Sequence, residues 1–166
     1  MRTPLAHSAR KKYPPQTYEA HVRGVCERAG KYAAEAECYS VKPNGILSTI
    51  VRDSALLHDL GKLEERNQSV LREQSRRRRH LPVDHTDAGS AALQKMGSGC
   101  AAMLVSSHHQ GLPDLSTEFA ARGCSIFRNG NAEVRAETDA ALPALLRQHE
   151  ALFPRKPNKE VQAYDG

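Results

Sequence analysis

Apolar residues recur in the first third of the chain at the three-and-four spacing of helices that bury one face. The first series comprises Tyr18, His21, Val22, Val25, Ala29, Ala33 and Ala36. The second series comprises Leu47, Ile50, Val51, Ser54, Leu57 and His58, and it ends at Gly61. Between the two series, Pro43, Asn44 and Gly45 predict a turn. We therefore expect two helices, with His21 on the inner face of the first and His58 at the end of the second.

The second half of the chain continues the helical pattern in shorter segments. Asp84 or Thr86 can cap a helix that starts near His85. Its expected inner positions are Ala88, Ala92 and Met96, and the next series is Ala101, Leu104, Val105 and His108, stopped by Gly111 and Pro113. From residue 116 onward the pattern is interrupted, and we expect a helix over residues 132–153 that is kinked or broken at Pro143. Because no strand-rich region is apparent, the predicted fold is all-α, a helical bundle with histidines at helix ends.

Length and composition fit one domain. The chain has 166 residues, of which 39% are hydrophobic, enough to fill one core. We expect a domain over residues 1–153, either complete or truncated at its C-terminal end, and a basic linker or tail over residues 154–166. No apolar run approaches the roughly eighteen residues of a membrane-spanning helix, and the polar start lacks the apolar segment of a signal peptide. This predicts a soluble, cytoplasmic protein without a membrane partner.

The four cysteines are scattered and form no Cys-x-x-Cys pair; they are Cys26, Cys38, Cys100 and Cys124. A free thiol behaves as a small apolar side chain and is commonly buried. We therefore expect these residues to lie in the core and to carry no chemistry.

Positive charge is concentrated in one segment. The net charge is +5 and the pI is near 9.2, which favours a polyanionic partner. Four consecutive arginines, Arg76, Arg77, Arg78 and Arg79, precede His85 and are candidates for contacts with such a partner. The alternative is a solvated loop that its own charge keeps away from the core. Because aromatic residues make up only 5% of the chain and Trp is absent, base stacking cannot be the main grip on a nucleic acid.

Histidines and one aspartate carry the candidate chemistry. In chain order they are His21, His58, Asp59, His85, His108 and His109. Imidazole and carboxylate side chains hold divalent metals at neutral pH, and six of them exceed what one tetrahedral site needs. A single histidine on an apolar stripe is as readily a hydrogen-bonded core residue. The adjacent pairs His58-Asp59 and His108-His109 are harder to explain by packing, because each would bury two polar side chains. We therefore predict one or two divalent transition-metal ions, Fe, Mn, Co, Ni or Zn, with Mg²⁺ also compatible; the two oxygens of Asp59 can bridge a pair of ions.

The sequence around these residues resembles a known family. Leu57-His58-Asp59-Leu60-Gly61-Lys62 is similar to the signature of the HD phosphohydrolase superfamily. Further blocks resemble the HD nuclease domain of the CRISPR-associated helicase-nuclease of type I systems; they are Ala6-His7-Ser8, Tyr18-Glu19-Ala20-His21-Val22, Asp84-His85-Thr86-Asp87-Ala88-Gly89 and Ser107-His108-His109-Gln110-Gly111-Leu112-Pro113-Asp114. The resemblance spans residues 7–115, and the order of the five blocks carries it.

The resemblance implies a metal-dependent nuclease that hydrolyses single-stranded DNA in CRISPR interference, together with a helicase and an RNA-guided surveillance complex. By the family pattern, His21 and His58 serve one ion, His85, His108 and His109 serve the other, and Asp59 and Lys62 act in catalysis. Lys62 would offset charge on the phosphate in the transition state; its alternative is a solvent-facing lysine at a helix end. The chain has no Gly-x-x-x-x-Gly-Lys-Ser/Thr motif, so the helicase would be another domain or protein.

The sequence departs from the family in two places. Gln110 stands where the family has a glycine, and no residue clearly matches the late aspartate of the superfamily. Asp139 is the candidate on an expected helix, whereas Asp114 belongs to a turn and Asp165 to the tail. Two other functions therefore stay open: an HD-type hydrolase of nucleotides or cyclic nucleotides, and a non-catalytic, truncated HD module.

Overall fold

A computed structural model describes residues 2–10, 12–41, 45–73, 80–109, 111–112, 114–123 and 126–154. These residues form a mostly helical fold with a small two-stranded sheet, which confirms the predicted all-α class. The elements in chain order are β1 (Leu5–His7), β2 (Gln16–Thr17), α1 (Tyr18–Glu37), α2 (Ile46–Leu57), the 3-10 helix η1 (Leu60–Leu63), α3 (Glu65–Arg72), α4 (Asp87–Lys95), α5 (Gly99–Ser107), α6 (Leu115–Arg122) and α7 (Ala132–Leu152). The basic run 76–79 and the tail from residue 155 lie outside the described residues.

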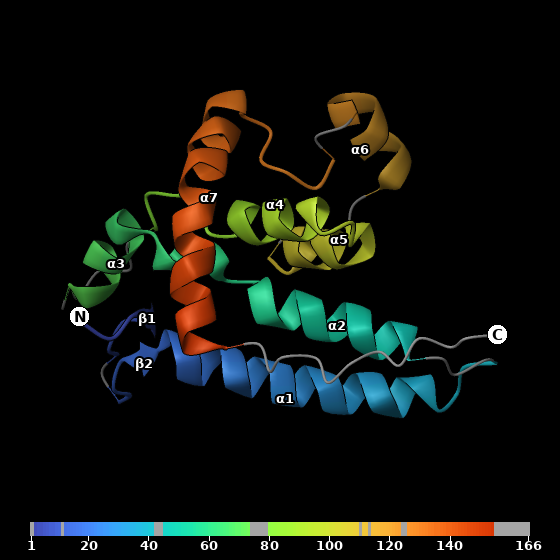
Figure 1. Ribbon diagram of the computed structural model, residues 1–166, viewed down its shortest axis with the longest axis horizontal. Helices are drawn as coiled ribbons and strands as arrows, with labels where there is room; N and C mark the ends of the chain where they lie inside the picture. Colours follow the sequence, from blue (N-terminus) through green and yellow to red (C-terminus); the bar gives the residue numbers. More distant parts are fainter. Residues whose placement is uncertain are drawn as a thin grey trace, which may run out of the picture.

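The two long N-terminal helices lie side by side and form one edge of the molecule (Figure 1). Helix α1 begins at Tyr18 because the Thr17 hydroxyl caps it, accepting a hydrogen bond of 3.1 Å from the amide of Ala20. Helix α2 starts after Gly45, whose φ of 73° suits a residue without a Cβ. Its carboxyl end leads directly into η1, which brings His58 and Asp59 to the middle of the fold.

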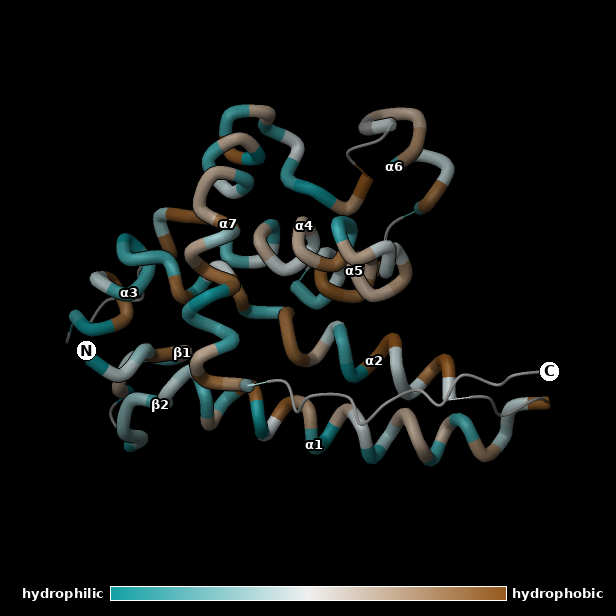
Figure 2. The backbone as a smooth tube through the Cα atoms, viewed as in Figure 1, coloured by the Kyte–Doolittle hydropathy of each residue, from teal (hydrophilic) through white to brown (hydrophobic). Residues whose placement is uncertain are grey.

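The core lies where α2, η1, α4, α5 and α7 pack against one another. Its largest fully buried apolar side chains include Tyr18, Leu60, Leu63, Leu93 and Leu142. They come from four elements, α1, η1, α4 and α7, and these elements together enclose one shared core. Figure 2 shows brown, apolar stretches on several helices that are interrupted by polar turns.

Several details differ from the sequence prediction. Ala36, Leu47 and Met96 were expected inside but are exposed, because each lies near the end of its helix, beyond the contact with its neighbours. Helix α7 runs through Pro143 without breaking; the proline faces solvent while buried residues on the other side hold the helix in place. Helices α3 and α6 and the small sheet were not predicted at all.

The cysteines also correct an expectation. Cys38 and Cys100 are exposed and Cys26 is only half-buried, whereas Cys124 lies outside the described residues. Both exposed thiols sit near a helix end, where one turn has no neighbour to cover it. Within the described part of the chain, no helix is both long and apolar enough to cross a membrane.

Candidate metal centre

The ends of separate helices bring five histidines around one aspartate. His21 lies in the first turn of α1, and His58 is the C-terminal cap of α2. His85 precedes α4, while His108 and His109 follow α5. Among the described residues, two groups of side chains are close enough to hold an ion; one is His21, His58 and Asp59, and the other is Asp59, His85, His108 and His109. The structure thus brings together all six predicted metal-ligand candidates.

Asp59 belongs to both groups through different oxygens. Its Oδ2 lies 2.9 Å from Nε2 of His21 and 3.1 Å from Nε2 of His58. Its Oδ1 lies 3.7 Å from Nε2 of His85 and 4.0 Å from Nε2 of His108. The carboxylate therefore stands between two sets of imidazoles and presents one oxygen to each.

The spacing of these atoms fits metal ligation. Two ligands at about 2.0–2.2 Å from one ion lie roughly 3 to 3.5 Å apart, close to the separations around Asp59. Nε2 of His85 lies 2.8 Å from Nε2 of His109, and Nε2 of His21 lies 3.1 Å from that of His58. Among the described residues, Oδ1 of Asp59 is buried without a hydrogen-bond partner, a costly state that a cation would relieve. The residues present therefore fit one ion in each group.

Backbone carbonyls orient two of the imidazoles. Nδ1 of His58 lies 2.8 Å from the carbonyl oxygen of Ala55, and Nδ1 of His108 lies 2.6 Å from that of Val105. If Nδ1 donates its proton to the carbonyl, the neutral ring carries a free lone pair on Nε2, the atom that faces Asp59. Outer hydrogen bonds of this kind are usual for metal-binding histidines.

The electrostatics of the cluster favour the protonation states that bind metal. Burial lowers the pKa of His85 to about 4, and the nearby charge of Lys62 adds to this effect. The side chain of His108 is only 24% exposed, and the partial burial of its ring lowers its pKa as well. For Asp59, burial alone would raise the pKa, but the adjacent side chains of His21, His58 and Lys62 hold it well below its usual range. At neutral pH these shifts favour an ionised Asp59 and neutral rings at His85 and His108, the forms that bind a metal.

Lys62 is buried beside the aspartate. Its Nζ donates a hydrogen bond of 2.7 Å to Oδ2 of Asp59, and only 8% of its side chain is exposed. The solvent-facing alternative for Lys62 is therefore wrong. The ammonium group neutralises part of the carboxylate charge and holds its orientation.

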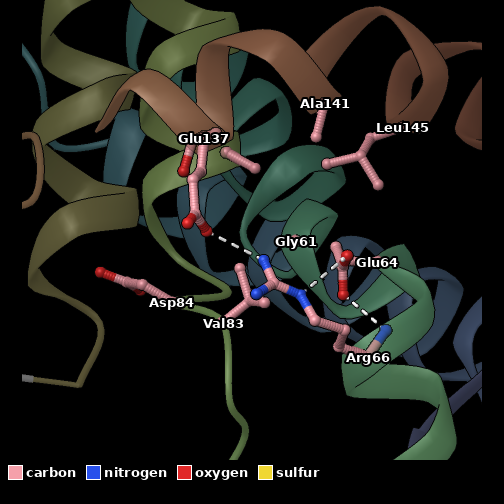
Figure 3. A pocket seen from close by; sticks show the side chains of 10 residues that line it. Gly61, Glu64, Arg66, Val83, Asp84, Glu137, Ala141 and Leu145 are labelled. Atoms are coloured by element: carbon pink, nitrogen blue, oxygen red, sulfur yellow. Dashed lines mark hydrogen bonds and ion pairs between the residues drawn. The ribbon is translucent and has the colours of Figure 1, made fainter. Parts of the chain in front are cut away.

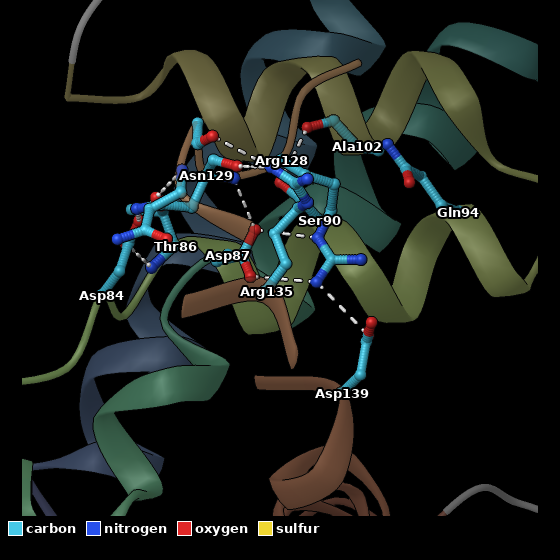
Figure 4. Close-up of polar contacts among 12 residues, drawn as sticks. Asp84, Thr86, Asp87, Ser90, Gln94, Ala102, Arg128, Asn129, Arg135 and Asp139 are labelled. Atoms are coloured by element: carbon cyan, nitrogen blue, oxygen red, sulfur yellow. Dashed lines mark hydrogen bonds and ion pairs between the residues drawn. The ribbon is translucent and has the colours of Figure 1, made fainter. Parts of the chain in front are cut away.

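A network of polar residues supports the turn that carries His85 (Figure 4). Arg128 donates to both oxygens of Asp87, over 2.8 and 3.0 Å, and the Asp87 side chain is fully buried. Asn129 donates from its backbone to Asp87 over 2.8 Å and from its side chain to Asp84 over 2.8 Å. Asp84 and Asp87 flank His85, so the segment at 128–129 fixes the position of this histidine. The sequence indicated neither Arg128 nor Asn129, because no local motif marks them.

Asp139 does not join the metal cluster. Its Oδ1 lies 3.3 Å from Arg128 and 3.9 Å from Lys95, and the Arg128 guanidinium lies between it and the buried Asp87 (Figure 4). The candidate for the late aspartate is therefore wrong, since the periodicity of α7 turns Asp139 toward these cations. Among the described residues, the group around His21 and His58 has Asp59 as its sole carboxylate.

A separate pocket, which none of the metal-ligand candidates lines, lies between η1 and α7 (Figure 3). Gly61 of η1 and Leu145 of α7 are among the residues that line it. Arg66 bridges its mouth with hydrogen bonds to Glu64 and, over 2.9 Å, to Glu137. The pocket holds about 30 Å³, room for about one water molecule and far less than a nucleotide needs.

Comparison with family models, with curated proteins and with solved structures finds no match for this chain. The geometry of the cluster, together with the order of its residues along the chain, is therefore the basis for any assignment of function.

Proposed function

We propose that this protein is a metal-dependent nuclease of the HD phosphohydrolase superfamily that hydrolyses phosphodiester bonds in single-stranded DNA. The resemblance to the nuclease domain of type I CRISPR helicase-nucleases suggests the polymer, a helicase partner and an RNA-guided surveillance complex. The observation that carries the proposal is the Asp59 carboxylate, whose two oxygens face two separate histidine groups.

In this proposal the six candidate ligands form two metal sites that share Asp59. His21, His58 and Asp59 would hold one ion, and Asp59, His85, His108 and His109 the other. An ion bound there would supply a hydroxide near neutral pH and positive charge for the phosphate oxygens. Lys62 keeps Asp59 ionised and oriented between the two groups. Its further role as a cation for the transition-state phosphate stays a prediction.

The shape of the site favours a polymer over a mononucleotide. Asp59 is buried, but His108 and His109 are exposed, so the second group opens to solvent. A long strand can pass across such an open site, whereas an enzyme for free nucleotides usually surrounds its substrate. The nucleotide hydrolase is therefore the less favoured candidate. A non-catalytic module is supported by the lack of a second carboxylate in the first group among the described residues.

The test compares His58→Ala and Asp59→Ala with the unchanged protein. Cleavage of a labelled single-stranded DNA oligonucleotide is followed with Mn²⁺, Ni²⁺, Co²⁺ or Mg²⁺ added. Because each substitution removes a ligand, we expect at least a hundredfold loss of metal-dependent cleavage, with no cleavage by the unchanged protein in chelator.

His80→Ala is the matched control, because His80 is exposed and lies outside both groups. It should cleave at the rate of the unchanged protein. Persistent cleavage by both His58→Ala and Asp59→Ala would refute the proposal. Turnover of mononucleotides without cleavage of DNA would instead support the nucleotide hydrolase.

A further inference from the structure

The N-terminal hairpin carries cations and an exposed aromatic ring. Strand β1 pairs with β2, and beyond them Arg10 and Tyr13 exchange two backbone hydrogen bonds of 2.9 Å. Tyr13 is 71% exposed, and Arg10 and Lys12 are exposed as well. Residues 1–17 contain two arginines and two lysines but no acidic residue. A surface of this composition attracts polyanions and offers one ring for stacking.

The base of the hairpin is anchored to the core. The side chain of Gln68 on α3 accepts a hydrogen bond of 2.9 Å from the amide of Leu5 and donates one of 2.8 Å to its carbonyl. Ala6 is buried, and the amide of Tyr18 donates to the carbonyl of Pro4 over 2.9 Å. These contacts fix the hairpin relative to the helices that carry the metal ligands (Figure 1).

The hairpin is also adjacent to the histidine cluster. The ring of His7, at the end of β1, packs edge-on against the ring of His21, with 4.7 Å between the ring centres. An extended chain spans at most about 3.6 Å per residue, so Arg10 lies within about 11 Å of His7, and Tyr13 is paired with Arg10. Arg10 and Tyr13 are therefore within a few nucleotides of a phosphate bound at the metal centre.

We propose that the tip of this hairpin, formed by Arg10, Lys12 and Tyr13, grips single-stranded nucleic acid next to the bond to be cleaved. Tyr13 stacks on an unpaired base, and the two cations contact neighbouring phosphates. A duplex keeps its bases stacked on one another, so it offers no base to Tyr13. The inference rests on the proposed nuclease function and adds the residues that select a single strand.

Binding is measured by fluorescence anisotropy with labelled oligothymidylate in the presence of chelator, so that no cleavage is needed. Tyr13→Ala should weaken this binding about 5- to 150-fold, the range for loss of one stacked base. Tyr13→Phe should bind like the unchanged protein, because the ring is kept. Arg10→Ala combined with Lys12→Ala should lower the slope of log affinity against log salt by roughly 1.4, about 0.7 for each cation.

Tyr32→Ala is the matched control, since Tyr32 is 62% exposed on α1 and lies eleven residues beyond His21, about 16 Å along the helix. It should leave the affinity unchanged. A duplex of the same length should bind Tyr13→Ala and the unchanged protein equally. Hydrolysis of bis(p-nitrophenyl) phosphate with metal should be equal for all hairpin variants, because this small substrate does not extend from the metal centre to the tip of the hairpin.

The outcomes separate the two proposals. If Tyr13→Ala binds oligothymidylate as tightly as the unchanged protein, or if the unchanged protein does not bind it at all, the hairpin proposal is wrong. If the binding results are as expected but no phosphodiester is hydrolysed with any metal, the hairpin grip stands and the nuclease proposal fails. Circular dichroism of each variant verifies that the hairpin substitutions leave the helical fold intact.

Discussion

At the scale of single residues, Asp59 lies at the centre of the histidine cluster. Its carboxylate is buried, it accepts a hydrogen bond from Lys62, and its two oxygens face different imidazoles. A buried charge of this kind is tolerated only when cations or hydrogen bonds surround it. Asp59 thus belongs to both groups of candidate ligands, whereas each histidine belongs to one group. A histidine substitution therefore changes one group and leaves the other complete.

Substitution of one histidine should remove one ion at a time. His21→Ala takes a ligand from the first group, and His109→Ala takes one from the second. Loss of an outer-shell partner already weakens metal binding about 10- to 100-fold, so loss of a ligand should cost at least that much. Elemental analysis after equilibration with Mn²⁺ or Ni²⁺ should give about two ions for the unchanged protein and about one for each variant. Identical stoichiometry in all three proteins would contradict the division into two groups.

Two histidines should make the metal-free protein less stable in acid. Burial lowers the pKa of His7 and of His85 to about 4, from an ordinary value of 6.5. Between these values the unfolded chain binds more protons than the folded one, so the free energy of unfolding falls as the pH is lowered from about 6.5 to 4. Above about pH 6.5 both residues are neutral in the folded and the unfolded chain, so they no longer make the free energy of unfolding depend on pH. Urea unfolding in chelator, followed by circular dichroism, measures the effect.

The histidine variants provide the control for this pH dependence. His7→Gln should flatten the dependence between pH 6.5 and 4, whereas His80→Gln, at an exposed position, should leave it as it is. An unchanged slope in a double variant of His7 and His85 would show that other groups cause the acid sensitivity.

At the scale of elements, close contact between two turns sets the geometry of the cluster. Gly61, in η1, donates from its amide to the carbonyl of His85 over 3.1 Å. A Cβ at position 61 would lie 2.7 Å from the Cα of His85 and 2.8 Å from its oxygen, closer than real Cβ atoms approach. Because the obstacle is backbone, it cannot turn aside as a side chain would. The absence of a side chain at Gly61 therefore allows His85 to reach Asp59.

Gly61→Ala should consequently damage both stability and the second ligand group. Forcing extra volume into this contact should cost about 1–3 kcal/mol of unfolding free energy and displace His85 from Asp59. Gly24→Ala is the matched control, since nothing lies within 4 Å of a Cβ there and alanine favours helix by about 0.5–1 kcal/mol. Urea unfolding and metal titration of both variants provide the measurement. Full metal affinity in Gly61→Ala would contradict the role assigned to this contact.

At the scale of the whole molecule, one buried ion pair joins distant parts of the chain. Arg128 and Asp87 are 41 residues apart, yet they meet in a two-pronged contact beneath the turn of His85. Asn129 extends the contact to Asp84. These contacts join the segment before α7 to the start of α4. Because His85 lies between Asp84 and Asp87, the same contacts hold His85 in place.

Removal of the cation should therefore destabilise the entire fold. Arg128→Ala leaves Asp87 buried and charged, which typically costs about 3–5 kcal/mol. Arg128→Lys should rescue only part of this loss, because an ammonium group cannot match both oxygens at once. Arg52→Ala, which breaks an exposed pair with Asp53, should change stability by less than about 1 kcal/mol. Equal stability of the Arg128 and Arg52 variants in thermal unfolding would refute this account.

Local sequence was sufficient for the helices around the cluster and for the choice of its candidate metal ligands. The three-and-four spacing around His21 and His58 is a property of one helix at a time, so it can be recognised without the fold. The same holds for the doublet His58-Asp59 and for the pair His108-His109, which stand next to each other in the chain. The short α3 and the small β1–β2 sheet were missed, because contacts with other elements rather than periodicity hold them in place.

Only the tertiary structure decided how the ligands group and what supports them. The separation of the oxygens of Asp59, the burial of Lys62 and the contact of His7 with His21 depend on how helices pack. The same packing pairs Asp139 with Arg128 rather than with a metal ligand. The sequence by itself thus determined which side chains can bind metal and which of them lie at helix ends. Their distances, charges and partners follow from contacts between residues far apart in the chain, which no local pattern encodes.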